Sequence, residues 1–151
     1  MGSSCCSSNS SIYPSDRYKS DEKVKLPKRI ILPEHSKILY YEKQETYQSY
    51  RLKYLLKNHF STISITNGEK RLLNQIERAD ERSIYLILTN KVHEETIESL
   101  LKNGKIQGIY STLNETNVKS DRQSTKFQGF YEDFFSLKRA IYSQIRSNDD
   151  Y

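Results

Sequence analysis

The chain of 151 residues has only two cysteines, Cys5 and Cys6, which are adjacent near its start. No cysteine follows them. Adjacent cysteines close no useful loop, so the sequence excludes a disulfide-stabilised domain and indicates a reducing, cytosolic environment. The sequence also lacks any run of about 18 apolar residues that could span a bilayer. Its first residues have neither the basic start nor the apolar stretch of a secretory signal. Any membrane contact is therefore expected to be peripheral.

Proline is absent after Pro33, and six of the first eleven residues are serine. A segment of this composition cannot bury enough apolar surface to offset the entropy lost on ordering. We therefore predict a disordered tether over residues 1–35, an α/β domain over residues 36–148 and a short tail over residues 149–151. Within the tether, residues 30–32 are apolar and are expected to pack against the domain as a short strap.

The start of the chain resembles an acylation site. Removal of Met1 would expose Gly2 for N-myristoylation and would leave Cys5 and Cys6 available for S-palmitoylation. Two anchors are needed, because a single myristoyl chain binds a bilayer reversibly, at about 10⁴ M⁻¹. The usual pattern has Ser or Thr where this chain has Cys6, so an inert tail stays open as the alternative. The prediction is a protein held peripherally at the inner, cytoplasmic face of a membrane, with its acyl groups in the lipid.

Five short apolar runs have the length of strands: residues 37–41, 61–66, 83–88, 106–113 and 127–131. Apolar residues recur at helical spacing in four other segments: residues 44–60, 72–79, 92–101 and 134–145. A polar loop is expected over residues 114–126. This alternation predicts an α/β domain of three layers, with a five-stranded parallel sheet in the flavodoxin-like order 2-1-3-4-5.

In this fold, ligand chemistry collects at the carboxyl ends of the strands. The residues that follow the first, third and fourth predicted strands there are polar: Glu42, Thr89, Asn90, Ser111 and Thr112. Glu132 and Asp133 follow the fifth strand. These residues are the candidate site, although their types do not form a recognisable catalytic set.

The size and strand plan of residues 37–146 resemble a response-regulator receiver domain. The resemblance implies an acidic pair after the first strand, an aspartate after the third, a hydroxyl after the fourth and a lysine after the fifth. Only the hydroxyl has a good match, at Ser111 or Thr112. Neither Thr89 nor Asn90 can form an acyl phosphate, and Glu42 alone is a poor magnesium ligand set. We therefore expect no phosphotransfer, no cofactor and no catalytic residue.

Residues 105–111, together with the aromatic last helix, are similar to the degenerate receiver-like domain that precedes arginine ADP-ribosyltransferase or tetratricopeptide regions in some invertebrate multidomain proteins. This similarity implies an accessory module. No transferase or repeat region is recognisable in the chain, so those activities are not expected of it.

Two enzymatic alternatives share the strand plan. A TIR-like NAD hydrolase would need a catalytic carboxylate such as Glu94, Glu95 or Glu98, and a flavodoxin would need a phosphate-binding loop after the first strand. The sequence has no phosphate-binding motif of the GxxxxGK[ST] or GxGxxG type. The three histidines are scattered, so no metal site is expected.

The net charge of +5 would also suit a soluble RNA-binding domain. Basic and acidic residues are expected to be interleaved on every predicted helix, which disfavours nucleic acid as a partner. Among the twelve tyrosines, five are expected to pack on apolar faces: Tyr40, Tyr47, Tyr50, Tyr54 and Tyr85. The sequence thus favours a membrane-tethered, non-catalytic receiver-like module for signalling or protein interaction.

Overall fold

The computed structural model describes residues 28–112 and 126–149, and within them five strands form one all-parallel sheet. The strands are β3 (Ser36–Tyr41), β4 (Ile63–Thr66), β5 (Ser83–Leu88), β6 (Ile106–Ser111) and β7 (Phe127–Phe130). Their spatial order is β4-β3-β5-β6-β7, which is 2-1-3-4-5 in chain order. The predicted sheet is therefore confirmed.

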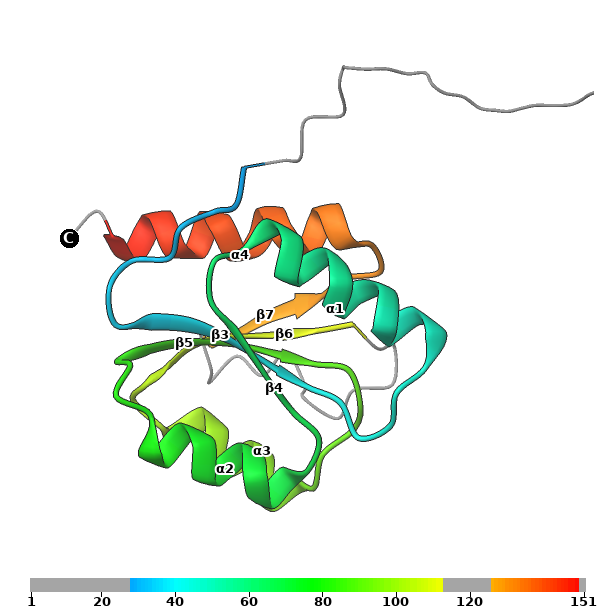
Figure 1. The fold of residues 1–151 in the computed structure, drawn as a ribbon. Coiled ribbons are helices and arrows are strands. Elements are labelled where there is room, and N and C mark those ends of the chain that lie inside the picture. Colours follow the sequence, from blue (N-terminus) through cyan, green and yellow to red (C-terminus); the bar gives the residue numbers. More distant parts are fainter. Residues whose placement is uncertain (1–27, 113–125, 150–151) are drawn as a thin grey trace, which may run out of the picture.

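Four helices cover the two faces of the sheet: α1 (Tyr47–His59), α2 (Glu69–Arg78), α3 (Glu94–Lys102) and α4 (Phe134–Asp149). Helices α1 and α4 lie on one face, and α2 and α3 lie on the other (Figure 1). This arrangement confirms the predicted three-layer α/β fold. It follows from right-handed crossovers between parallel strands, each of which returns the chain through a helix.

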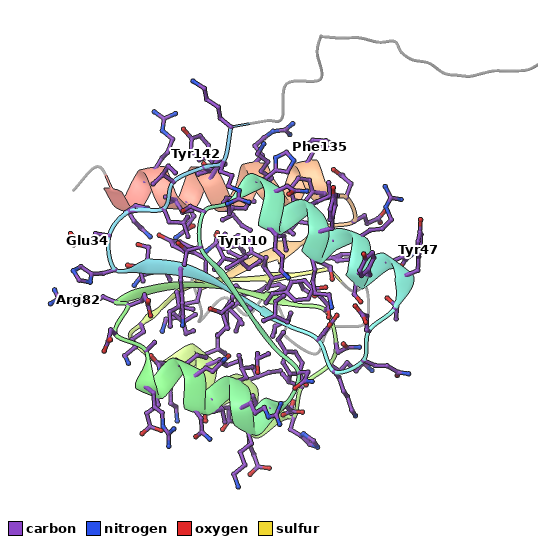
Figure 2. All side chains as sticks on the ribbon, viewed as in Figure 1. Glu34, Tyr47, Arg82, Tyr110, Phe135 and Tyr142 are labelled. Atoms are coloured by element: carbon purple, nitrogen blue, oxygen red, sulfur yellow. The ribbon has the colours of Figure 1, made fainter. Side chains whose placement is uncertain are left out.

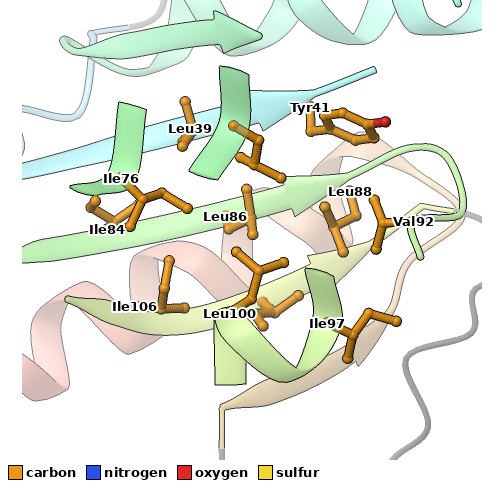
Figure 3. Close-up of a cluster of buried hydrophobic side chains, with 12 residues drawn as sticks. Leu39, Tyr41, Ile76, Ile84, Leu86, Leu88, Val92, Ile97, Leu100 and Ile106 are labelled. Carbon is orange, nitrogen blue, oxygen red and sulfur yellow. The ribbon is translucent and has the colours of Figure 1, made fainter. Parts of the chain in front are cut away.

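Alternate residues of the central strands pack into two separate cores. Leu39, Leu86 and Leu88 face α2 and α3, in a cluster that includes Ile76 and Leu100 (Figure 3). The residues between them face the other way, so β5 is buried on both sides. Each fully buried Leu or Ile contributes roughly 1.5–3 kcal/mol. This two-sided burial explains why residues 84–88 form a continuous apolar run.

The second core lies beneath α1 and α4. Ile38, Tyr40 and Ile87 from the sheet pack there with Leu56 of α1 and Ile141 of α4. Both helices therefore depend on the same face of β3 and β5 for their position.

Helix α1 begins three residues later than the periodicity predicts, because Thr46 caps it. The Thr46 Oγ1 atom accepts a hydrogen bond from the Ser49 backbone at 3.1 Å, and the Ser49 hydroxyl accepts one from the Thr46 backbone at 2.7 Å. This reciprocal pair is a capping box, which satisfies backbone donors that the first helical turn leaves without partners.

The strap, defined here as residues 28–35, packs on the α1–α4 side of the sheet. The Ile30 backbone donates to the carbonyl of His59 at 2.7 Å, and the Ser61 backbone donates to the carbonyl of Ile30 at 2.9 Å. Leu32 is buried in the second core, whereas the Ile31 side chain is 76% exposed. The apolar segment thus packs as expected, while residues 1–27 of the predicted tether and residues 150 and 151 of the predicted tail lie outside the described residues.

The prediction for the tyrosines is only partly correct. Tyr40 and Tyr85 are buried, but Tyr47, Tyr50 and Tyr54 are 74%, 58% and 61% exposed. They repeat at helical spacing on the outer side of α1, while the leucines of the helix face the sheet. Spacing alone identifies one side of a helix without saying whether that side faces inward.

The expectation of interleaved charge on every helix is wrong for α1 and α4. These two helices together contain six basic residues and one acidic residue, Asp149. In contrast, α2 and α3 together contain four basic and five acidic residues. The positive charge of the helices is therefore concentrated on one layer of the domain.

His59 joins α1 to α4 at the end of the second core. Its ring is buried and lies 4.8 Å from the ring of Phe134, and its Nδ1 atom is 2.9 Å from Nζ of Lys138. Burial, followed by the positive charge of Lys138, lowers the pKa of His59 below its ordinary value of 6.5. The neutral imidazole is the form that accepts a hydrogen bond from Lys138.

We expect the free energy of unfolding to decrease as the pH falls below 6.5, the ordinary pKa of His59. In this range the unfolded chain binds the proton more readily than the folded chain. The contribution of neutral His59 to the free energy of unfolding is therefore fully present above pH 6.5, and it is lost as the pH falls toward the lower pKa of the folded state. Denaturant titrations from neutral pH to about 5.5 measure the slope. His59→Asn should flatten it, since the amide cannot titrate.

His35→Asn is the control, because His35 is exposed and its positive φ of 67° suits asparagine. The control should keep the slope of the unchanged chain. Equal slopes for His59→Asn and the unchanged chain would show that this histidine does not carry the pH dependence.

Candidate functional site

The carboxyl ends of the parallel strands meet at one edge of the sheet, and the predicted polar residues follow them there. Two backbone hydrogen bonds hold this edge together, from Glu42 to the carbonyl of Thr66 at 3.0 Å and from Thr89 to the carbonyl of Tyr41 at 3.1 Å. A third joins Thr112 to the carbonyl of Leu88 at 3.1 Å. The structure therefore brings the predicted edge residues into one region, and their side chains have different surroundings.

Glu42 is buried and paired with Lys53 of α1. The Lys53 Nζ atom lies 2.5 Å from Glu42 Oε2 and 2.8 Å from Glu45 Oε2. The Glu42 side chain is only 7% exposed, and the Lys53 side chain is 15% exposed. Burial alone would lower the pKa of Lys53, but its hydrogen bonds to Glu42 and Glu45 raise it above its ordinary value. Glu42 thus anchors α1 to the end of β3.

Thr89 and Asn90 connect β5 to the residues that follow β3. The Thr89 hydroxyl donates to the carbonyl of Tyr41 at 2.9 Å, and the Asn90 Oδ1 atom accepts from the Lys43 backbone at 2.7 Å. The Thr89 hydroxyl also lies 3.2 Å from Asn90 Oδ1. Both side chains are therefore engaged in joining neighbouring chain segments.

The two candidate hydroxyls after β6 differ in access. Ser111 is fully buried, so it does not face solvent. Thr112 is half-buried and lines a cavity. Of the two positions that match the hydroxyl of the receiver pattern, Thr112 is the accessible one.

A cavity of about 640 Å³ lies between the N-terminal parts of α1 and α4. Thr89, Asn90 and Thr112 contribute to its wall, whereas Glu42 and Ser111 do not line it. The aromatic side chains of Tyr47 and Phe135 contribute from the two helices. Only part of the candidate site therefore faces space that a ligand could occupy.

Glu132 and Asp133 also line the cavity, and Asp133 has a structural task. Its Oδ1 atom accepts from the Ser136 backbone at 2.9 Å, and its Oδ2 atom accepts from the Ser136 hydroxyl at 2.8 Å. These hydrogen bonds lower the pKa of Asp133. The carboxylate therefore caps the first turn of α4.

Several lining residues were not among the predicted site residues, notably Leu52, Leu55 and Phe135. Their apolar character predicts that they are buried. That they line the cavity depends on how α1 and α4 are rotated about their axes, which the sequence does not specify. No motif in the sequence marks this position.

The carboxylates considered for a TIR-like hydrolase lie on the other layer. Glu94, Glu95 and Glu98 are exposed on α3, and none of them lines the cavity. The exposed His93 pairs with Glu69 at 2.8 Å, which joins the starts of α2 and α3. Within residues 28–112 and 126–149, no three His, Cys, Asp or Glu side chains are grouped closely enough to hold a metal ion.

The predicted lipidation residues, Gly2, Cys5 and Cys6, lie outside the described residues. In the part of the chain that the structure describes, no helix combines the length and the apolar character needed to cross a bilayer.

Lys53→Met is expected to lower the free energy of unfolding by about 2 kcal/mol. Breaking a fully buried ion pair costs roughly 3–5 kcal/mol, and the loss is smaller here because the Lys53 side chain is partly exposed. The substitution keeps most of the apolar stem of the side chain but leaves the Glu42 carboxylate buried without its cation. Urea titration measures the loss. The double variant Glu42→Gln/Lys53→Met should recover most of it, because it removes the orphaned charge.

Lys57→Met is the matched control, since Lys57 is exposed on the same helix. Its effect should stay within about 0.5 kcal/mol. Equal losses for the two lysine variants would contradict the structural role assigned to the Glu42–Lys53 pair.

Comparison with known proteins identifies no relative. No family model matches the chain, and neither a curated protein nor a solved structure is significantly similar to it. The chain's own residues and geometry are therefore the basis on which a function can be proposed.

Proposed function

We propose that this chain is a membrane-tethered, non-catalytic interaction module. In this proposal a receiver-like α/β domain is held at the cytoplasmic face of a membrane by acyl groups on Gly2, Cys5 and Cys6. The domain then presents its surface to a protein partner in signalling. Its resemblance to degenerate receiver-like accessory domains supports such a role.

The proposal that the domain is non-catalytic is supported by the bonds that polar side chains at the carboxyl edge of the sheet make within the domain. Glu42 is paired with Lys53, Thr89 bonds to the last residue of β3, and Asn90 bonds to the chain just beyond it. A catalytic carboxylate or hydroxyl has to reach a substrate, within about 2.6–3.2 Å of the atom that it serves. Here these groups stabilise the edge itself.

The tether rests on the chemistry of the first six residues. Gly2 can accept a myristoyl chain after removal of Met1, and two adjacent thiols can accept palmitoyl chains. Dual acylation gives the stable anchoring that one chain does not provide.

The cavity supports a second candidate, a small nucleotide-using enzyme of TIR-like or flavodoxin type. Its volume of about 640 Å³ is within the range of small-molecule sites, roughly 300–1,000 Å³. Asn90, Thr112 and Glu132 could supply polar contacts in its wall. This candidate is weaker because the described residues of the wall include no nucleophile–base pair.

Metabolic labelling with alkyne analogues of myristate and palmitate tests the tether. We expect the unchanged chain to incorporate both analogues and Gly2→Ala to lose the myristate label. Palmitoylation usually follows membrane contact, so Gly2→Ala should also carry less palmitate. Cys5→Ser/Cys6→Ser should keep the myristate label and lose the palmitate label, because only the thiols form thioesters.

Absence of both labels from the unchanged chain would refute the anchor.

Incubation with NAD and an absorbance scan for bound flavin test the enzymatic candidate. Turnover of NAD that Glu132→Gln abolishes, or a purified chain with flavin absorbance, would replace the non-catalytic proposal.

A further inference from the structure

The α1–α4 layer carries every large apolar side chain that is exposed within residues 28–112 and 126–149. These side chains are Ile31, Tyr47, Tyr50, Tyr54, Phe135 and Tyr142. Figure 2 shows Tyr47, Phe135 and Tyr142 on the half of the domain that contains α1 and α4. Exposed apolar groups gathered on one side of a domain indicate a contact surface.

Basic side chains alternate with these apolar groups on both helices. On α4, Phe135, Arg139, Tyr142 and Arg146 repeat at spacings of four, three and four residues, which places them in a single stripe. All four are exposed. The stripe therefore presents aromatic rings and guanidinium groups together along the helix.

Helix α1 repeats the combination. Its outer side carries three exposed tyrosines, with the exposed Arg51 and Lys57 beside them. The Arg51 guanidinium lies 6.0 Å from the ring centre of Tyr47, and on α4 that of Arg146 lies 5.7 Å from the ring centre of Tyr142. Both helices thus place a cation against an aromatic face.

The acidic residues of this layer outside the helices lie in the strap, at Glu34, and just before the two helices. Glu45 is bound to Lys53, and Glu132 and Asp133 stand before the first turn of α4. Apart from Asp149 at the end of α4, the two helices contain no acidic residue. Their charge therefore complements an extended anionic surface.

The chain also enters the domain on this layer. The described residues begin at Lys28, and Lys28, Arg29 and Ile31 are exposed in the strap. The strap lies on the same side of the sheet as α1 and α4 (Figure 1), where Ile30 bonds to the end of α1. The strap therefore adds two basic side chains and one apolar side chain to this layer.

We propose that the α1–α4 layer is the membrane-facing surface of the domain and binds anionic phospholipid. Tyrosine suits the boundary between headgroups and acyl chains, because its ring is apolar and its hydroxyl is polar. Arginine and lysine bind the anionic headgroups, and each contributes about a factor of five in affinity. This inference extends the proposed tether by assigning an orientation, and it can be tested without acylation.

The full chain, produced without acylation, is mixed with vesicles of phosphatidylcholine alone or with added phosphatidylserine. We expect cosedimentation with the anionic vesicles only, and weaker binding as salt is added. Arg139→Glu/Arg146→Glu should bind at least about thirtyfold less tightly, because two favourable charges are lost and reversed. Tyr50→Ser/Tyr54→Ser should lose the binding that persists at high salt, which depends on apolar contact.

Lys70→Glu/Arg78→Glu is the matched control, because it changes the net charge equally from exposed positions on α2. It should bind within about threefold of the unchanged chain. Thermal unfolding followed by circular dichroism establishes that all of the variants are folded. Equal losses for the α2 and α4 variants, or no binding of the unchanged chain to anionic vesicles, would overturn the proposal.

The outcomes also separate this proposal from its alternatives. Retention on single-stranded RNA at physiological salt, without binding to anionic vesicles, would overturn it in favour of bases stacked on the tyrosines. Fatty-acid labelling without vesicle binding would leave the tether and refute the membrane-facing layer. Vesicle binding without labelling would refute the tether and support the layer.

Discussion

Burial of the central strand on both faces is the constraint on which the rest of the structure depends. Ser83–Leu88 directs alternate side chains into two cores, so the sheet needs a helical layer on each side. Both layers supply apolar inner sides, and their outer sides are then free to differ. The α2–α3 layer carries mixed charge, whereas the α1–α4 layer carries aromatic and basic residues. This asymmetry gives the domain two distinct surfaces.

The same packing decides what the carboxyl edge of the sheet can do. Helix α1 lies over β3 with Lys53 turned toward the end of that strand, where it meets the buried Glu42. A buried carboxylate is costly without such a partner, so this pair makes the position of α1 and the chemistry of the edge interdependent. At this edge Glu42 and Thr89 are bonded within the domain, whereas Asn90, Thr112 and Glu132 line the cavity. The exposed residues of α1 and α4 offer a separate surface for contacts.

The fold could be predicted because strand runs and helical spacing are local signals. Residues 84–88 form an unbroken run of aliphatic and tyrosine side chains, and Gly68 marks the turn before α2. The site was less predictable, since the pairing of Glu42 with Lys53 depends on the rotation of α1 about its axis. The same rotation explains the error for Tyr47, Tyr50 and Tyr54, whose spacing is helical on either side of α1. The contribution of Phe135 to the cavity likewise requires α4 to be placed beside α1.

We propose that the α1–α4 layer is the one that faces a membrane, and a site-specific probe on each layer can test this. The chain has no tryptophan, so a single introduced indole reports only on its own surroundings. Tyr142→Trp on α4 and Ser99→Trp on α3 both place the indole at an exposed position. With phosphatidylserine vesicles whose acyl chains are brominated, a membrane-facing α1–α4 layer predicts a blue shift and quenching of the fluorescence of Tyr142→Trp and neither change for Ser99→Trp. Equal quenching at both positions, or quenching of Ser99→Trp alone, would contradict it.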